Sequence, residues 1–462
     1  MINTHFFKKI IMDYRIEKDT LGEVKIPINA LWGAQTQRSY QNFQIGNDRM
    51  PLEMVFAIIA VKRAAAMANY DCGVLSEEKK DLIVFTCDQL LQAKYNDSFP
   101  LCVWQTGSGT QTNMNVNEVI ANLASQIFPD VDKLSPNDDV NKSQSTNDVF
   151  PTAMRIASAM EVVSSLIPVL EKLIDAFKQK SEAFNKINKI GRTHLMDATP
   201  LTLGDEFSAF QSQLEHGLDA ISMVMPHLFE LPIGGTAVGN GINAPKGYDQ
   251  KVVDFISESL DLPFQAAPNK FEAMASHDTF VELSGALKRL AVSLMKIGND
   301  IRLLSSGPRC GIGEITIPAN EPGSSIMPGK VNPTQCEALT MVCCQVIGND
   351  AAITTGALQG HLQLNVFMPL IAKNILHSIR ILTDAMLSFC DHCVVGIEPN
   401  PQVIDKHLKN SLMLVTALNP YIGYYNAAKV AQHAHQNNLT LRESAIELQI
   451  LTGDQFDQYM NQ

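Results

Sequence analysis

Residues 151–184 read PTAMRIASAMEVVSSLIPVLEKLIDAFKQKSEAF, and their apolar side chains recur every three or four positions. This spacing is typical of one face of a helix of about nine turns. Asp148 and Pro151 suit the start of such a helix, and Pro168 is expected to kink it. Because most helices span only about ten to fourteen residues, one this long needs long neighbours to cover its apolar face. The stretch therefore predicts a helical bundle.

Other long stretches repeat the same periodicity, and several are apolar on more than one side. They are residues 205–231, 272–305, 334–356 and 364–392. Burying such helices is easiest in a bundle that continues across the subunits of an oligomer. The sequence predicts an all-α fold.

The helical pattern changes along the chain, which suggests three segments. We predict an N-terminal helical domain (1–142), a central long-helix bundle (143–398) and a small C-terminal helical domain (399–462). Within the first, residues 1–11 are expected to be a disordered extension. The shorter helices of the N-terminal domain are predicted at 51–69, 76–95 and 113–128.

The composition excludes several classes of function. Of the 462 residues 45% are hydrophobic and 18% charged, which is normal for a globular protein with a large core. A net charge of −12 argues against nucleic-acid and acidic-membrane partners, because phosphate contacts need clustered Lys and Arg. No apolar run reaches the roughly 18 residues of a membrane helix, and no cleavable signal is evident. We expect a cytoplasmic protein that contacts no membrane.

The nine scattered cysteines are expected to be reduced thiols. Cys390 and Cys393 form a C-x-x-C pair, but the sequence offers no second cluster to complete a metal site. We therefore predict no metal.

Polar stretches interrupt the helical background at four places. They are TGSGTQTNMN (106–115), NKSQSTND (141–148), GRTHLMD (191–197) and GSSIMPGKVNP (323–333). Each alone could be a helix cap or a solvated loop. Their number, their shared chemistry and their expected positions at the ends of long helices favour a common site. Helix N-termini attract anions, so a small anionic substrate fits.

A nucleotide-binding interpretation of the last stretch fails on spacing. A phosphate loop reads G-x-x-x-x-G-K-[ST], whereas five residues separate Gly323 from Gly329, and Val331 follows the lysine.

The stretch 323–333 resembles the signature loop of the fumarase/aspartase superfamily. Together with the other polar stretches, KVNPTQCEALTMV (330–342) resembles class II fumarases, and the similarity runs from about Asp13 to the C-terminus. The resemblance implies reversible hydration of fumarate to L-malate, a step of the tricarboxylic acid cycle. It also implies that the reaction needs no metal and no organic cofactor. The expected assembly is a homotetramer with a twenty-helix core, whose active sites are shared between subunits.

The resemblance also implies roles for individual residues. Removing a proton from a carbon next to a carboxylate needs a base, an acid and many donors for the growing anion. By the family's pattern Ser324 is the base, stabilised by backbone N–H groups and Lys330. His194 acts at the hydroxyl end through a water, and Glu337 orients it. The residues expected to bind substrate are Ser108, Gly109, Thr110, Ser145, Thr146, Asn147, Thr193, Ser325, Lys330, Val331 and Asn332.

Two further features of the signature loop are expected to shape it. Gly329 would let the backbone approach closely. Asn332 would cap the next helix, with Pro333 at its first position.

A secondary dicarboxylate site of class II fumarases is expected to be weak or altered here. Where the family often has His-Pro-Asn-Asp, this chain has Ser135, Pro136, Asn137 and Asp138. A serine supplies no imidazole, and Asp132 stands where a basic residue is expected. Turn formation is the favoured role for this stretch.

Two alternatives stay open at the level of sequence. An aspartate ammonia-lyase shares the scaffold and the carbanion chemistry, and only details such as Gly329 and Gln111 speak against it. A catalytically inactive scaffold protein would be expected to lack an acid or a base, whereas Ser324, His194 and Glu337 are all present.

Overall fold

The computed structural model describes residues 13–460, so the expected extension at 1–11 lies outside the described residues. Helices dominate this part of the chain, and its strands form only two-stranded sheets, which confirms the all-α class. The chain divides into two compact units, which we describe separately. The first unit contains Met1–Pro168, Asp219–Ala291 and Cys344–Thr383; the second contains Val169–Leu218, Val292–Cys343 and Asp384–Gln462. The predicted division into three domains stays a prediction.

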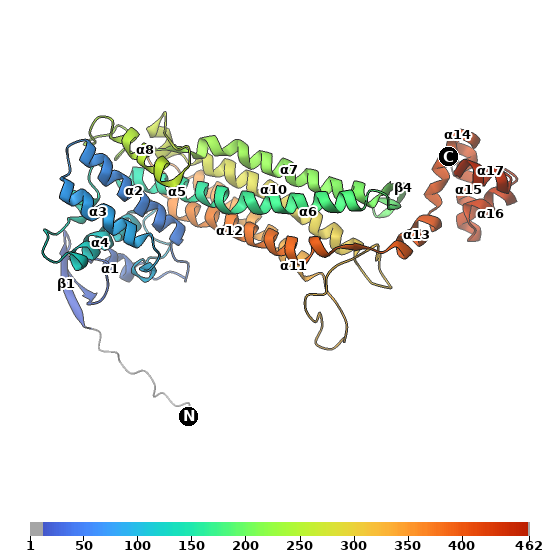
Figure 1. Cartoon of the computed structure of the whole chain (residues 1–462), viewed down its shortest axis with the longest axis horizontal. Helices are drawn as coiled ribbons and strands as arrows, with labels where there is room; N and C mark the ends of the chain where they lie inside the picture. Colours follow the sequence, from blue (N-terminus) through green and yellow to red (C-terminus); the bar gives the residue numbers. More distant parts are fainter. Residues whose placement is uncertain (1–12, 461–462) are drawn as a thin grey trace, which may run out of the picture. The chain divides into compact units, whose positions relative to one another are not determined.

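The first unit is built around helix α2, Leu52–Asp71 (Figure 1). Helices α3, α4, α5 and α8 pack against it, so side chains on several of its faces are buried. The elements of this unit are β1 (Tyr14–Asp19), β2 (Gly22–Pro27), α1 (Ala34–Asn42), α3 (Glu77–Leu90), η1 (Asn96–Ser98), α4 (Thr110–Ile127), η2 (Pro136–Val140), α5 (Thr146–Glu161), η3 (Val162–Leu166), β5 (Glu230–Leu231), α8 (Tyr248–Leu260), β6 (Gln265–Ala266) and α9 (Lys270–Ala275).

The second unit contains a phenylalanine cluster and a separate C-terminal core. Phe177, Phe207, Phe210 and Phe389 are fully buried, with ring centroids 5.5–6.5 Å apart in the contacting pairs. Each buried ring contributes roughly 1.5–3 kcal/mol to folding. The elements of this unit are α6 (Ile167–Ala183), β3 (Asn188–Thr193), β4 (Met196–Thr202), β7 (Ile315–Thr316), η4 (Val394–Gly396), β8 (Glu398–Pro399), α13 (Pro401–Asn410), η5 (Leu412–Leu418), α14 (Asn419–Ile422), α15 (Tyr424–Asn437), α16 (Leu441–Glu447) and α17 (Gly453–Met460). Helices α15 to α17 surround their own apolar core (Figure 1).

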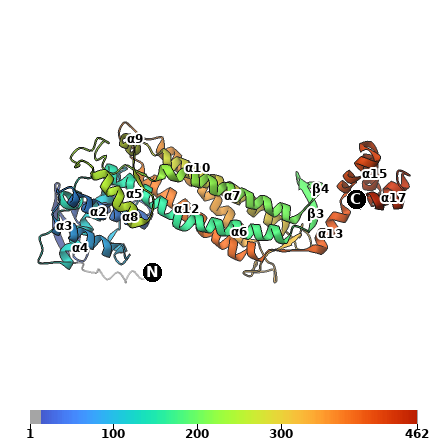
Figure 2. The same cartoon turned by 45° about the horizontal axis from the view of Figure 1, so that its top comes forward.

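The boundary between the units falls inside the four longest helices. These are α7 (Leu203–Leu228), α10 (Asp278–Leu304), α11 (Thr334–Ala357) and α12 (Met368–His392). Within the second unit, their segments and α6 lie side by side in both views (Figures 1 and 2). The helices expected at 205–231, 334–356 and 364–392 are therefore present, with ends within a few residues of the prediction.

Two expectations about helix ends were wrong. The helix expected at 151 begins at Thr146, because Ser145 and Asp148 form a capping box and Pro151 fits within the following turns. The helix expected at 272–305 is broken after α9, at Ser276 and His277. The kink expected at Pro168 stays a prediction; the turn before this residue is the π-helical η3, and Pro168 itself donates no N–H.

One helical stretch, Thr146–Ala183, is long and apolar enough to cross a membrane by length and composition, contrary to our expectation from the sequence. More than half of its apolar window is buried inside the protein. Buried core helices of globular proteins have the same composition, so the stretch is weak support for a membrane span.

Candidate active site

Ser324, the predicted base, lies in the long loop between α10 and α11 (Figure 1). Its Oγ accepts hydrogen bonds from the backbone N–H groups of Ile326 (3.3 Å) and Met327 (3.1 Å). Backbone donors at these distances stabilise an alkoxide more than a neutral hydroxyl. The same contacts also form an ordinary serine turn, so they permit the role without requiring it.

The base of this loop is closed by three hydrogen bonds. Gly323 N–H donates to the carbonyl of Lys330 (2.9 Å), and Asn332 Nδ2 donates to the carbonyl of Gly323 (2.6 Å). Lys330 Nζ donates to Asn332 Oδ1 (2.7 Å), which brings an ammonium and an amide together. The loop thus holds two of the predicted carboxylate-binding groups side by side.

One expectation about the signature loop was wrong. Asn332 does not cap α11, because its amide closes the loop instead; the helix begins at Thr334, and the carbonyl of Pro333 accepts the N–H of Glu337. Gly329 has a left-handed φ of 78°, but a Cβ there would meet nothing within 4 Å. The glycine suits this turn, and a close approach of its backbone in the active site stays a prediction.

His194 lies in a β-turn, not at the end of a long helix. Strands β3 and β4 pair antiparallel with Thr193 opposite Met196, which leaves His194 and Leu195 as a two-residue turn. Both have positive φ, 56° and 62°. Positive φ at both central residues characterises a type I′ turn, and it is costly for side chains other than Gly, Asn or Asp. The hairpin presents His194 to solvent in a strained conformation.

The single chain does not bring the predicted acid, base and orienting carboxylate together. His194 and Glu337 are both exposed. Among residues 13–460, no hydrogen bond or ion pair joins His194 to Glu337 or to Ser324. Thr193 and the middle of the signature loop, residues 325–331, are likewise open to solvent.

The first two polar stretches do meet, within the first unit. Asn113 Nδ2 donates to Thr146 Oγ1 (3.0 Å) and lies 3.2 Å from Asn141 Oδ1. Because Thr146 Oγ1 accepts this bond, its own proton is free for an acceptor such as a carboxylate. Ser108 Oγ and Thr110 Oγ1 share a hydrogen bond of 2.8 Å.

Gly109 has a structural reason to be glycine. It precedes α4 in the left-handed region (φ 75°), and a Cβ there would lie 2.2 Å from the ring of Phe150. The neighbouring Asn147 Nδ2 donates to the carbonyl of Ala237 (2.9 Å). These contacts fix the backbone around the predicted substrate-binding hydroxyls.

Comparison with known proteins identifies the family. A lyase family model matches residues 22–348, and a fumarase C C-terminus model matches residues 414–462. The chain is 59% identical to a class II fumarate hydratase of Pasteurella multocida, over 97% of this chain and 98% of that one. It is 56% identical to a class II fumarate hydratase of Helicobacter pylori, with the same coverage.

The chain belongs to the class II fumarate hydratase family. A crystal structure of a class II fumarase from Schistosoma mansoni superimposes with a TM-score of 0.95 at 44% identity, covering 97% of this chain and 98% of that one. The likeness therefore extends to the full set of helices.

Sequence reasoning missed a buried lysine in this fumarate hydratase family member. Lys62, on α2, is fully buried and donates to Asn141 Oδ1 (2.8 Å) and Gln144 Oε1 (2.9 Å). Burial lowers its pKa to about 7, against a smaller opposing effect of Asp148. Its one sequence signal is a lysine inside an apolar helix. Through these two hydrogen bonds Lys62 holds the polar stretch 141–148 in place.

Asp148 is the buried acid of the same stretch. Burial raises its pKa to about 6, although its carboxylate accepts N–H groups from Ser145, Gly234 and Thr236. These bonds tie the start of α5 to the loop after β5.

Residues of the expected secondary dicarboxylate site form hydrogen bonds within their own turn. Ser135 Oγ accepts from Asp138 N–H (3.0 Å), and Ser135 N–H donates to Asp139 Oδ2 (2.8 Å). Pro136 and Asn137 lie in the same π-helical turn, η2. The weakness of this site stays a prediction.

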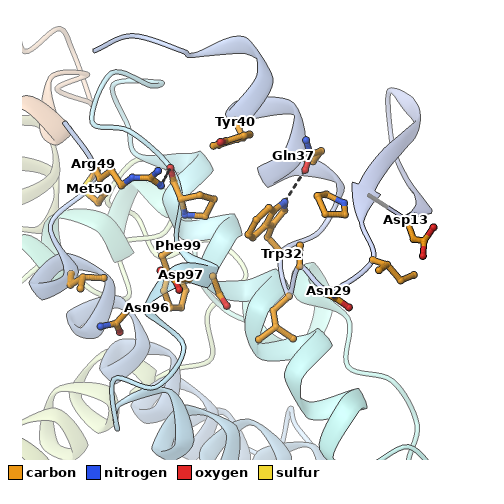
Figure 3. A pocket seen from close by; sticks show the side chains of 17 residues that line it. Asp13, Asn29, Trp32, Gln37, Tyr40, Arg49, Met50, Asn96, Asp97 and Phe99 are labelled. Atoms are coloured by element: carbon orange, nitrogen blue, oxygen red, sulfur yellow. Dashed lines mark hydrogen bonds between the residues drawn. The ribbon is translucent and has the colours of Figure 1, made fainter. Parts of the chain in front are cut away.

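Neither a metal cluster nor a disulfide was found where the structure describes the chain. A cavity of about 1120 Å³ opens in the first unit beside Trp32, Tyr40 and Phe99 (Figure 3). Trp32 Nε1 is already bonded to Gln37 Oε1 (2.9 Å), and none of the predicted site residues lines the cavity.

Proposed function

We propose that this chain catalyses the reversible hydration of fumarate to L-malate. The observation that carries the proposal is near-complete alignment, at 56–59% identity, with class II fumarate hydratases. The described loop around Ser324 supports it, because two backbone N–H groups already point at the oxygen that would take the proton.

In the dehydration direction, Ser324 removes the proton on the carbon next to one carboxylate of malate. The electron pair moves into that carboxylate, which becomes an aci-carboxylate dianion. Lys330 and Asn332, held 2.7 Å apart, bind and stabilise it. The Ile326 and Met327 N–H groups lower the cost of the serine alkoxide.

At the other carbon, the C–O bond breaks and the hydroxide leaves as water. His194 supplies the proton through a bound water and takes it back in the hydration direction, while Glu337 orients the imidazole. Neutral donors hold the two substrate carboxylates without adding competing bases. They include Ser108, Thr110, Ser145, Thr146, Asn147, Thr193 and Ser325, with the Gly109 and Val331 backbone beside them.

The active unit would be a homotetramer in which different subunits supply the acid and the base. The exposure of both His194 and Glu337 in one chain favours this arrangement. We assign the reaction to the tricarboxylic acid cycle, in the cytoplasm, with no metal and no organic cofactor.

The test is an ultraviolet assay of fumarate formation by EDTA-treated protein, with L-malate and L-aspartate in parallel. We expect fumarate from malate alone, and a Ser324→Ala variant should lose roughly 10²–10⁴-fold in kcat. Fumarate from aspartate would make the chain an ammonia-lyase. Activity lost with EDTA and restored by a divalent metal would contradict the metal-free assignment, and no product from either substrate would favour an inactive scaffold.

A further inference from the structure

A buried carboxylate lies behind the hairpin that carries His194. The Glu314 side chain is fully buried and receives Arg192 Nη2 at 2.7 Å and Nη1 at 3.0 Å. Lys189 Nζ lies 3.2 Å from the same carboxylate. Burial alone would raise the pKa of Glu314, but the hydrogen bonds from Arg192 and His407 and the charge of Lys189 lower it below its ordinary value. Glu314 is therefore an anion held by three side chains.

Two of these three side chains belong to β3, the strand that leads to the turn. Lys189 and Arg192 flank a bulge in the β3–β4 register, and Thr193 and His194 follow directly. The turn itself is strained, since His194 and Leu195 both have positive φ. Strained backbone persists only where surrounding contacts over-determine it. The pair of cations on Glu314 supplies such contacts at the base of the hairpin.

The third side chain comes from the C-terminal segment. His407, on α13, places Nδ1 3.1 Å from Glu314 Oε1 and 3.4 Å from Arg192 Nη2. A carboxylate only accepts, so the hydrogen bond to Glu314 is made by the tautomer of His407 that carries a proton on Nδ1. The neutral ring makes the same bond as the charged one. Only 29% of the His407 side chain is exposed.

The backbone repeats this connection. Helix α13 packs against β3, and η5 packs against β4. Asn400 N–H, just before α13, donates to the carbonyl of Glu314 (2.8 Å), while Glu314 N–H donates to the carbonyl of Leu304 at the end of α10 (2.9 Å). Glu314 thus joins the hairpin, the C-terminal segment and the start of the loop that leads to Ser324.

We propose that His407 is a positioning residue for the hydration reaction. Through Glu314 and Arg192 it fixes the hairpin that presents Thr193 and His194, so that α13 forms part of the support of the active site. The proposal rests on the proposed role of His194 in proton transfer.

The test compares two replacements of similar size. His407→Asn keeps an N–H donor near the position of Nδ1, whereas His407→Leu keeps the bulk and removes the donor. We expect His407→Leu to lower kcat roughly tenfold with KM for malate changed by less than about twofold, because displacing a proton-transfer group slows the reaction more than it weakens binding. His407→Asn should restore most of kcat. Lys409→Ala, on the same helix but in an ion pair with exposed Asp405, is the control and should leave both constants unchanged.

A double-mutant cycle tests the route of the effect. In a Glu314→Gln background, His407→Leu should have little further effect on kcat, because the acceptor of its hydrogen bond has been weakened. Equal kcat for His407→Leu and the unmutated protein, or equal loss in the Leu and Asn variants, would overturn the proposal. Additive effects in the cycle would overturn the route through Glu314. His194→Asn is measured alongside. If this variant stays active, the proposed role of His194 in proton transfer is wrong. If it is inactive and His407→Leu is not impaired, only the positioning role of His407 is wrong.

Discussion

At the scale of single residues, burial changes the pKa of Lys62, which contacts the polar stretch 141–148. Its pKa falls to about 7, whereas the ordinary pKa of a lysine is 10.5. Between these two pH values the folded chain has released the proton, while the unfolded chain still holds it. The burial penalty is therefore largest below pH 7 and fades as the pH rises. Relative to Lys62→Met, the free energy of unfolding of the unmutated protein should rise by about 2 kcal/mol between about pH 7 and about pH 9. Urea-unfolding curves at these two pH values measure it.

Lys94, an exposed lysine, provides the control for this prediction. Lys94→Met should leave the difference in unfolding free energy from the unmutated protein nearly constant over the same range. If the stability of the unmutated protein relative to Lys62→Met does not change between these pH values, the buried amine keeps its ordinary pKa.

At the scale of an element, the β3–β4 hairpin carries measurable strain in its turn. Leu195 has a φ of 62° and is 74% exposed, so its cost is conformational and little packing offsets it. Leu195→Gly should stabilise the protein by about 0.5–1 kcal/mol, after allowing for the greater freedom of glycine in the unfolded chain. Leu195→Val, which is β-branched, should destabilise it by about 1–2 kcal/mol. Thermal unfolding of both variants tests this, and equal stability of the two would show that the turn is not strained.

The same element shows why sequence reasoning placed the helices but missed the hairpin. The long helices repeat apolar residues over many turns, and burial of that face determines them. The strands of residues 188–202 are short, and the turn His194-Leu195 lacks the Gly or Asn that normally marks a type I′ hairpin. The geometry is imposed instead by tertiary contacts of Arg192 and Lys189 with Glu314, which lies far away in the sequence.

In the candidate site too, features set by neighbouring residues could be predicted, and features set by distant contacts could not. The signature loop could be read locally, because its donors to Ser324 come from the next few residues. The capping role of Asn332 could not, since its amide prefers the carbonyl of Gly323 on the opposite side of the loop. Lys62 gave no usable signal, because a lysine inside an apolar helix is ambiguous until its acceptors, Asn141 and Gln144, are seen beside it.

At the scale of the whole molecule, the predicted acid and base should come from different subunits. Ser324→Ala and His194→Asn are each expected to be nearly inactive. When both chains are co-expressed, a site that takes its serine from one subunit and its histidine from another has about one chance in four of receiving both intact. The mixture should therefore recover about a quarter of the activity, measured as fumarate formed from malate.

Co-expression of Ser324→Ala with Asn332→Ala is the matched control. Both changes lie in one closed loop of one subunit, so no mixed site has both residues intact. Recovery of activity in the control as well would mean that unmutated enzyme contaminates the preparation. Recovery in neither mixture would place His194 and Ser324 of each site on the same chain.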